Sequence, residues 1–417
     1  MEGKVSAMIM KSAGLGPGFE PEARWPLEPR DEVKGLPGSR IREVANAGFG
    51  RTDILRFWFG ESDEPTPVFI KDAAIDALAR NEVFYTHNNG REDLRQELSS
   101  YLSKLHRLKI EPVKISVTSS GVSALMMATQ AVVSPGDRVV VVTPVWPNVA
   151  EIPAILGAEV VRVGLRPSPS GWRLDLDELL EAITPKTRLL VINSPSNPTG
   201  WIISSDEQKV ILSHARKLGV WILADDVYER LVYQEGITSA PSFLQIAAPE
   251  DRVIGANSFS KAWLMTGWRL GWLIAPKELE SDIGKLIEFN TSCAPGFIQS
   301  AAFAALRHGE EFVQSLRQDL YHKRERLLLG LRSIAGVDAP TPEGGMYVFF
   351  RIRGQDDSVE LAKRLVSEAR LGLAPGVAFG PEGEGWMRWC FAARQSGLDE
   401  GVEQLRAWAA QNQSMGV

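Results

Sequence analysis

The chain has 417 residues, of which 44% are hydrophobic and 24% charged, and its formal net charge at pH 7 is −6. This length predicts two or three domains with a large buried core, and the mild acidity argues against nucleic acid as the main partner, since a phosphate backbone favours a basic surface. No run approaches the roughly eighteen consecutive apolar residues of a membrane helix.

The first 37 residues are rich in glycine, proline and charge, and they show no sustained hydrophobic period. We expect an arm or disordered leader here, including the glycine-rich residues 14–18. The segment lacks the apolar core of a signal peptide. The two cysteines, Cys293 and Cys390, have no metal-like spacing and are most simply buried thiols in a reducing compartment. The prediction is a cytoplasmic protein without a metal site.

From Ser39 onward the chain alternates between helical and strand-like patterns. A short helix is expected to begin at Ser39, followed by a strand at residues 55–59 that ends at Gly60. A one-sided apolar period predicts helices at residues 68–79, 90–106 and 121–133. Short apolar runs without alternation predict strands at residues 115–118, 139–142, 160–163, 189–192, 221–224, 253–256 and 270–275.

Apolar runs of this kind are typical of strands whose two faces are both covered by helices. We therefore predict an α/β fold with a large, doubly wound, mostly parallel seven-stranded sheet domain at residues 65–310. A long amphipathic helix at residues 310–331 follows. Strands at 346–352 and 387–391, with a helix between them at 358–369, predict a smaller α/β domain. This domain would be built from both termini, residues 1–64 and 311–417, and would include the strand near Leu55.

Five of the predicted strands are followed by unusual polar or aromatic residues. These segments begin at Ser119, Pro144, Asn193, Asp225 and Ser258. Because the carboxyl ends of parallel strands lie at one edge of a sheet, the segments are expected to converge on one ligand site.

The segment at residues 257–271, which includes Ser-Phe-Ser-Lys and Gly-Trp-Arg, connects two of these strands. We expect Phe259, Trp263 and Trp268 to wall in Lys261, because partial desolvation favours the neutral, nucleophilic amine. Ser258 and Arg269 can hold a phosphate on the same side. Alone, this segment could equally be a solvated surface loop. Together with the other strand ends, it predicts a lysine that forms a Schiff base with a phosphate-bearing aldehyde.

A pyridoxal phosphate site also requires a carboxylate for the ring nitrogen and groups for the ring oxygen. Asp225 ends a buried strand, where a carboxylate is costly unless a cation such as a pyridinium pairs with it. A helix cap or surface acid is the alternative, for which Asp226 is the better candidate. Tyr228 and Asn197 can both hydrogen-bond the ring oxygen.

The phosphate is expected at the start of the predicted helix at Gly121, where free N–H groups and the helix dipole attract an anion. Gly121 and Val122 offer backbone N–H groups there. Ser120 and Ser123 add hydroxyls, or alternatively only cap the helix. Trp146, at another strand end, is placed to stack on the cofactor ring.

Arg388 lies on a late strand among apolar neighbours. A guanidinium in such surroundings favours a carboxylate, which its planar fork binds with two hydrogen bonds. Arg388 is therefore predicted to bind a substrate carboxylate, and an intramolecular salt bridge is the alternative.

Together these residues resemble the class I/II aminotransferase family of fold-type I pyridoxal-phosphate enzymes. The resemblance runs from about Ser39 to the C-terminus and rests on the motifs at residues 85–90, 94–95, 193–200, 225–228 and 258–271 and on Arg388. It implies catalytic roles for Lys261, Asp225 and Tyr228, with Lys261 also moving the proton between the substrate Cα and the cofactor.

The same resemblance implies the remaining contacts. The residues that match cofactor-binding positions are Ser120, Gly121, Val122, Asn197, Ser258 and Arg269. Arg388, with Asn197 and the backbone at Gly60, would bind the substrate α-carboxylate. Tyr85 would reach the phosphate of the neighbouring subunit in a homodimer. Some relatives have threonine or lysine in place of Val122, so only a backbone contact is expected there.

The resemblance implies transfer of an amino group from an L-amino acid to a 2-oxo acid through a Lys261 aldimine and a pyridoxamine form. Cleavage of a C–S bond, or related β-lyase chemistry, is the alternative on this scaffold. A cofactor-sensing regulator would need a DNA-binding domain, for which the leader is too short. Aromatic residues near the expected pocket, and no assignable second arginine, favour an aromatic or hydrophobic donor.

Overall fold

The computed structural model describes residues 27–168 and 170–413, so the predicted glycine-rich leader at residues 14–18 lies outside the described chain. The chain divides into two units, residues 1–37 and residues 38–417. In the described part of the first unit, the regular structure is the short helix α2 (Asp31–Lys34). No helix within the described residues is long and apolar enough to cross a membrane.

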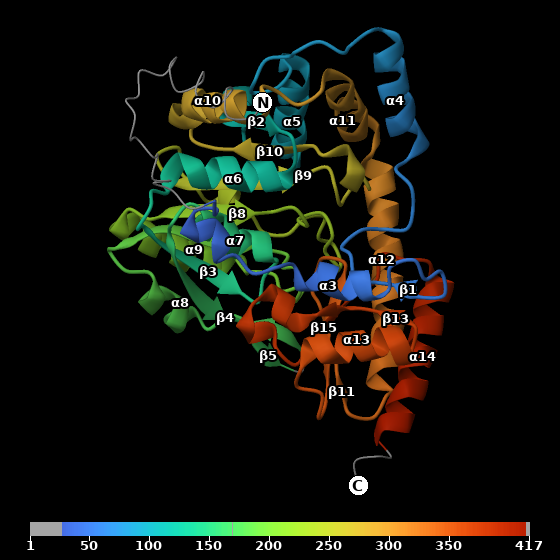
Figure 1. Cartoon of the computed structure of the whole chain (residues 1–417). Coiled ribbons are helices and arrows are strands. Elements are labelled where there is room, and N and C mark those ends of the chain that lie inside the picture. The colour runs from blue at the N-terminus through green and yellow to red at the C-terminus, as the bar shows by residue number, and fades with distance from the viewer. Residues whose placement is uncertain (1–26, 169, 414–417) are drawn as a thin grey trace, which may run out of the picture. The chain divides into compact units, whose positions relative to one another are not determined.

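A seven-stranded sheet organises the second unit (Figure 1). In spatial order its strands are β2 (Ile115–Thr118), β10 (Gly271–Ile274), β9 (Val253–Ser258), β8 (Trp221–Asp225), β7 (Thr187–Asn193), β3 (Arg138–Thr143) and β4 (Glu159–Gly164). β10 runs antiparallel to both of its neighbours, and the other pairs are parallel. The prediction of a mostly parallel seven-stranded sheet is confirmed.

Helices cover both faces of this sheet (Figure 1). Val139 and Val141 of β3 share a core with α6 (Gly121–Val132), α7 (Pro147–Ile155) and α10 (Glu280–Thr291). Val140 and Val142, which point to the opposite face, belong to a core that includes α8 (Leu176–Ala182) and α9 (Ser205–Leu218). A third core joins β2 and β10 to α4 (Val68–Ala79), α5 (Glu92–His106) and α11 (Gly296–His308). Burial of both faces explains the apolar runs without alternation.

The C-terminal region contains a second, four-stranded sheet. Its strands, in spatial order, are β11 (Val337–Asp338), β12 (Tyr347–Ile352), β15 (Trp386–Cys390) and β14 (Ala374–Pro375). The helices α12 (Glu310–Arg332), α13 (Ser358–Glu368) and α14 (Gln395–Gln413) belong to this region. The helix α3 (Arg40–Ala47), from the N-terminal part of the chain, packs against α13.

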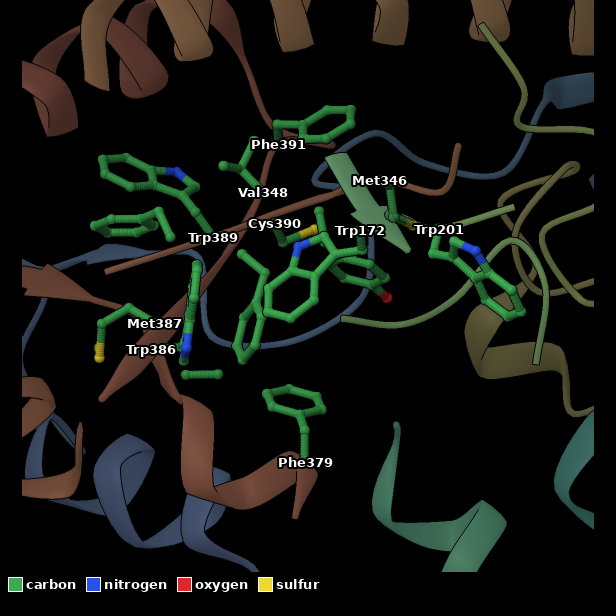
Figure 2. Packing of buried hydrophobic residues seen from close by; sticks show 14 of the residues in the cluster. Trp172, Trp201, Met346, Val348, Phe379, Trp386, Met387, Trp389, Cys390 and Phe391 are labelled. Carbon is green, nitrogen blue, oxygen red and sulfur yellow. The ribbon is translucent and has the colours of Figure 1, made fainter. Parts of the chain in front are cut away.

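Large aromatic side chains fill the core of this region (Figure 2). Trp386 stacks on Phe349 with 5.5 Å between the ring centroids. Trp172 comes from the hairpin of β5 (Arg166–Ser168) and β6 (Gly171–Arg173), and its ring centroid lies 4.7 Å from that of Trp386. The hairpin follows the edge strand β4 of the large sheet, so its Trp172 links that sheet to the C-terminal core.

The N-terminal segment joins the C-terminal region as predicted, but through a shorter strand. β1 (Leu55–Arg56) pairs in parallel with β13 (Leu371–Gly372) in a separate two-stranded sheet. After β1, the Phe57 N–H still donates to the Gly372 carbonyl at 2.7 Å, and the Trp58 carbonyl accepts a hydrogen bond from the Arg388 guanidinium. The chain is thereby drawn towards a cavity beside the large sheet.

Candidate active site

A cavity of about 240 Å³ opens at the carboxyl ends of the parallel strands. Asn193, Asp225 and Ser258, the last residues of β7, β8 and β9, all line it. The structure brings every predicted site residue to this cavity except Ser120 and Tyr85. The predicted residues in its wall are Gly60, Gly121, Val122, Trp146, Asn197, Asp225, Tyr228, Ser258, Lys261, Arg269 and Arg388.

Hydrogen bonds of Asn193 fix the neighbouring strand ends relative to one another. Its Nδ2 donates to the backbone carbonyl of Asp225 over 3.1 Å, and its Oδ1 accepts from the backbone N–H of Asn197 over 2.8 Å. The carbonyl of Asn197 in turn accepts from the N–H of Trp146 at 2.8 Å. Three loops that follow three strands are thus held as one wall of the cavity.

Asp225 is buried with little to compensate its charge. Its Oδ1 accepts one long hydrogen bond, 3.4 Å, from the N–H of Val227, and no cation of the described chain lies within ion-pair distance. Burial raises the pKa of this carboxyl to about 7, although the Val227 N–H and the Lys261 charge oppose the rise. The carboxylate therefore suits a cationic partner that the chain itself does not supply.

Asp226 is not a surface acid or helix cap, contrary to the alternative that the sequence suggested. It is buried, and its Oδ2 accepts a hydrogen bond from the Ser242 hydroxyl at 3.0 Å. Burial, with the nearby Glu229, raises the pKa of Asp226 to about 8. Successive residues at the end of β8 point to opposite faces, and both faces are covered, so neither carboxylate reaches solvent.

Lys261 is half-buried, and its Nζ donates a hydrogen bond to the carbonyl of Gly60. Desolvation lowers the pKa of the amine to about 8, and Arg388 and Arg269 add to the effect. The Nζ atom lies 5.8 Å from the ring centroid of Tyr228. A neutral amine is therefore accessible near physiological pH.

The prediction that Phe259, Trp263 and Trp268 wall in this lysine is wrong. The ring centroid of Phe259 lies 5.2 Å from that of Trp263, and both side chains belong to the core beneath α5 and α11. Trp268 donates its indole N–H to the Thr66 hydroxyl at 3.0 Å. The aromatic residues that line the cavity come from other segments, namely Trp58, Phe59, Trp146, Tyr228 and Tyr347.

Arg388 is fully buried, and none of the described acidic side chains forms an ion pair with it. Its Nη1 donates to Asn197 Oδ1 at 3.0 Å, its Nη2 donates to the Trp58 carbonyl, and its Nε has no partner among the described residues. The guanidinium carbon lies 4.5 Å from the ring centroid of Tyr347. The alternative of an intramolecular salt bridge is not found in the described part of the chain. A carboxylate from outside would complete this site.

An anion-binding corner forms where α6 begins. The Ser120 hydroxyl accepts from the Ser123 N–H at 2.9 Å and caps the helix, while Gly121 and Val122 line the cavity. Gly121 lies so close to β9 that a Cβ there would be 3.0 Å from the Cβ of Ser258. A helix N-terminus, the hydroxyl of Ser258 and the guanidinium of Arg269 are together suited to a phosphate.

Several residues of the site escaped sequence reasoning. Tyr347 lines the cavity, and its hydroxyl lies 2.7 Å from that of Tyr228. A Cβ at Gly60 would lie 2.2 Å from the Tyr347 hydroxyl, so only glycine fits at that position. Ser260, whose hydroxyl lies 2.8 Å from that of Ser258, and Trp58 were also missed. The consecutive glycines 344 and 345 before β12 were the available signal, since they mark a close backbone approach.

Tyr85 lies outside the cavity, and 89% of its surface is exposed. The resemblance assigned this side chain to the site of a second subunit. The assignment stays a prediction.

Comparison with known proteins agrees with this geometry. Residues 52–405 match the family described as aminotransferase class I and II. The chain is 32% identical to an aspartate aminotransferase of Pyrococcus horikoshii over 370 residues, which are 88% of this chain and 93% of that protein. It is also 32% identical to a probable N-acetyl-LL-diaminopimelate aminotransferase of Bacillus subtilis, over 88% of this chain and 92% of that one.

Solved structures give the same result. An aspartate aminotransferase from Thermotoga maritima superposes with a TM-score of 0.85 at 30% identity, covering 92% of this chain and 100% of that one. An aromatic aminotransferase from Pyrococcus horikoshii superposes with a TM-score of 0.82 at 30% identity, covering 89% and 99%. The chain therefore belongs to the class I and II aminotransferase family and is a transaminase of pyridoxal-phosphate fold type I.

Proposed function

We propose that the cavity binds pyridoxal phosphate and an L-amino acid with an uncharged, hydrophobic side chain, whose amino group passes to a 2-oxo acid. The observation that carries this proposal is the pair of uncompensated charges in the cavity. Among the residues that the structure describes, none forms an ion pair with Asp225 or with Arg388, and the amine of Lys261 lies in the same cavity. A cationic ring nitrogen would pair with the first, and the substrate carboxylate with the second.

The residues present fit the cofactor group by group. Lys261 would hold the aldehyde, Asp225 would accept the hydrogen bond of the ring N–H, and Tyr228 and Asn197 would donate to the ring oxygen. Trp146 would cover one ring face. Contacts to the phosphate would come from Gly121, Val122, Ser258 and Arg269. Ser120, predicted as a further contact, lies outside the cavity wall, and its hydroxyl would hold the start of the helix in place.

Bound in this way, the cofactor supplies an electron sink that stabilises negative charge at the substrate Cα. Arg388 would orient the substrate through its carboxylate, with Asn197 holding the guanidinium at 3.0 Å. Lys261 Nζ, once exchanged for the substrate amine, would take up and return the Cα proton. A pKa of about 8 suits an amine to this task near neutral pH.

The cationic side chains of the cavity support a substrate whose own side chain is uncharged. The cationic side chains in its wall are Lys261, Arg269 and Arg388, and each already has a proposed partner. None of the described residues in the wall is left to pair with a second carboxylate. The remaining wall includes Ile41, Trp58 and Phe59, which favour apolar contact.

The β-lyase alternative is not favoured, because the relatives to which the chain is similar are named as aminotransferases. Transamination and β-elimination give different products. To test this, the cofactor-loaded protein is mixed with single amino acids in the absence of any 2-oxo acid. Loss of the visible absorbance of the aldehyde form, with one equivalent of the matching 2-oxo acid, is expected. Release of ammonia and pyruvate with return of the original spectrum would favour the lyase.

The same assay tests the substrate class. Phenylalanine and methionine are expected to react faster than aspartate. Turnover of aspartate without any reaction of phenylalanine or methionine would contradict the assignment of the three cations.

We further propose a homodimer in which Tyr85 reaches the phosphate in the partner's cavity. Three successive side chains support this surface, since Val83, Phe84 and Tyr85 are 56%, 79% and 89% exposed. Sedimentation velocity is expected to give twice the chain mass, and a monomer with full activity would exclude this role of Tyr85.

A further inference from the structure

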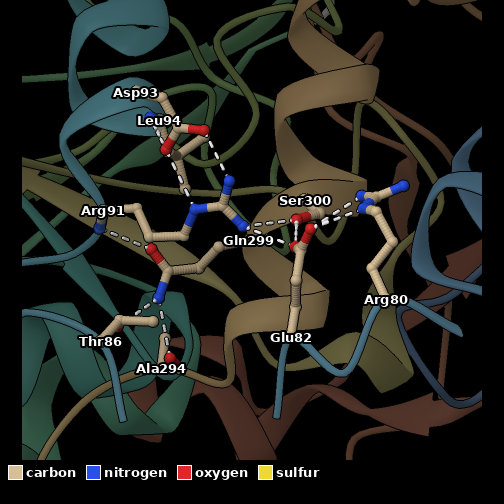
Figure 3. Close-up of polar contacts among 9 residues, drawn as sticks. All are labelled: Arg80, Glu82, Thr86, Arg91, Asp93, Leu94, Ala294, Gln299 and Ser300. Atoms are coloured by element: carbon tan, nitrogen blue, oxygen red, sulfur yellow. Dashed lines mark hydrogen bonds and ion pairs between the residues drawn. The ribbon is translucent and has the colours of Figure 1, made fainter. Parts of the chain in front are cut away.

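The loop that joins α4 to α5, residues 80–91, combines an exposed apolar tip with a tightly bound base. The tip consists of Val83, Phe84 and Tyr85. The residues on either side of it are held by side chains from α11 and from the loop itself (Figure 3). Loops are usually more mobile than the elements they connect, and a group of exposed apolar side chains often marks an interaction site. An exposed apolar tip on a fixed base therefore indicates a binding surface.

Glu82 ties the two ends of the loop together (Figure 3). Its Oε2 lies 2.9 Å from Nη1 of Arg91 and accepts a hydrogen bond from the Ser300 hydroxyl at 2.5 Å, while its Oε1 lies 2.8 Å from Nη2 of Arg80. Arg91 is held from its other side by Asp93, at 2.6 Å. The residue before the apolar tip is therefore fixed both to the end of the loop and to α11.

Gln299 fixes the residue that follows the tip. It is completely buried in α11, and its Nε2 donates to the Thr86 hydroxyl at 2.9 Å and to the Ala294 carbonyl at 2.8 Å. Its Oε1 accepts from the backbone N–H of Arg91 at 2.8 Å. The amide of Gln299 thus uses both of its N–H donors and its oxygen to hold this loop and the segment that precedes α11.

Backbone contacts complete the clamp. The N–H of Thr86 donates to the Cys293 sulfur at 3.4 Å, and the N–H of Val83 donates to the Asn81 carbonyl at 2.8 Å. The side chains of Phe84 and Tyr85 project beyond these contacts, with 79% and 89% of their surface exposed. A loop of fixed shape has already lost the conformational entropy that binding would otherwise cost.

We propose that Glu82 and Gln299 are positioning residues that hold this loop in the shape in which Tyr85 enters the cavity of a second copy of the chain. The inference rests on the proposed homodimer and on the proposed contact between Tyr85 and the cofactor phosphate. Both residues act through Tyr85, so their loss weakens retention of the cofactor and leaves the chemistry at Lys261 in place.

The test is a double-mutant cycle on the cofactor-loaded, full-length protein. Glu82→Gln keeps the shape of the side chain and removes its charge, and Tyr85→Phe removes only the hydroxyl. The dissociation constant of pyridoxal phosphate is measured for both single variants, for the double variant and for the unaltered protein. Glu82→Gln alone is expected to weaken cofactor binding roughly three- to tenfold, and to have no further effect once the Tyr85 hydroxyl is absent.

Control variants separate positioning from a general loss of stability. Glu92→Gln makes the same change of charge on an exposed residue next to the loop that does not contact Glu82, and it should leave the dissociation constant unchanged. Ser300→Ala removes one hydrogen bond to Glu82 and should raise the dissociation constant of the cofactor by less than Glu82→Gln does. Gln299→Leu removes the hydrogen bonds to Thr86 and Arg91 and should also weaken cofactor binding. If this variant fails to fold because it buries an apolar group among polar partners, Ser300→Ala still tests the clamp.

The outcomes distinguish the two levels of the proposal. If Tyr85→Phe weakens cofactor binding, and Glu82→Gln weakens it equally with and without the Tyr85 hydroxyl, positioning through Tyr85 is refuted while the role of Tyr85 stands. If Tyr85→Phe binds the cofactor normally in an intact dimer, the proposed role of Tyr85 fails, and the inference fails with it.

Discussion

The cavity and the base of the 80–91 loop are both rich in charge, yet they treat charge in opposite ways. In the cavity, Asp225 and Arg388 are both buried, and neither forms an ion pair with any other residue in the described part of the chain. At the base of the loop, Glu82 contacts Arg80, Arg91 and Ser300, and Arg91 contacts two carboxylates. Every strong charge there has its partner within the chain.

The protonation equilibria reflect this contrast. Burial raises the pKa of the Asp225 carboxyl to about 7, whereas the Ser300 hydroxyl and two arginines hold the pKa of Glu82 near 2. A buried charge that the fold leaves unpaired marks a place that an external group completes, because isolation in a poorly polar environment is costly. A fully paired cluster serves to hold backbone in place.

The largest effect should follow from Lys261→Ala, which removes the amine of the cavity. Transaminase turnover should fall at least about a thousandfold because both the attachment of the cofactor aldehyde and the transfer of the Cα proton depend on this group. Initial rates and circular dichroism should show an inactive but folded protein. Lys285→Ala, which alters an exposed lysine, is the matched control, and near-normal turnover of the Lys261 variant would refute its central role.

Asp225→Asn should stabilise the cofactor-free protein. Below about pH 4 the carboxyl is protonated in both the folded and the unfolded chain, and it has no effect on stability. Between about pH 4 and 7 the carboxyl ionises in the unfolded chain but not in the folded one, so the free energy of unfolding falls as the pH rises. Above pH 7 the total loss reaches about 2–4 kcal/mol. Denaturant titration at pH 8 should therefore favour the asparagine variant, while its turnover is strongly reduced.

Glu82→Gln should change stability in the opposite direction. Its carboxylate gains partners on folding, so its stabilisation is present above the unfolded pKa and is lost only as pH falls towards about 2. Denaturation of the cofactor-free variant at pH 8 should show a loss of about 1 kcal/mol. If the asparagine and glutamine variants shifted stability in the same direction, the contrast between unpaired and paired charge would not hold.

Arg388→Lys should impair use of the amino acid more than binding of the cofactor. An ammonium cannot make the two parallel hydrogen bonds of a guanidinium. We therefore expect kcat/KM to fall roughly thirtyfold, which corresponds to a loss of about 2 kcal/mol in transition-state stabilisation. Most of the loss is expected in KM. Arg394→Lys, on an exposed arginine, should leave the kinetics unchanged, and a fall in cofactor affinity alone would place Arg388 elsewhere in the mechanism.

The smallest effect concerns the pH dependence of cofactor capture. Because the pKa of Lys261 is about 8, roughly one amine in ten is neutral at pH 7. The rate at which the cofactor-free protein captures the aldehyde should therefore rise about fivefold between pH 7 and 8 and level off above pH 9. Stopped-flow absorbance checks this, with the non-aldehyde alcohol analogue of the cofactor as the control for phosphate binding.

The sequence alone determined the sheet and the positions of most site residues. Apolar runs without alternation identified all seven strands, and the residues that follow them, such as Asp225 and Ser258, line the cavity. These features are local, since a strand is read from consecutive residues and its end is read from the next few. The same reasoning placed Arg388 in a buried strand.

Only the tertiary structure decided which side chains face one another. Phe259 and Trp263 turn into a core rather than towards Lys261, and Asp226 is buried. The partners of Arg388 and Glu82, namely Asn197 and Ser300, lie 191 and 218 residues away in the chain. Apolar periodicity reports that a residue is buried but not what it is buried against, because that depends on how distant elements pack.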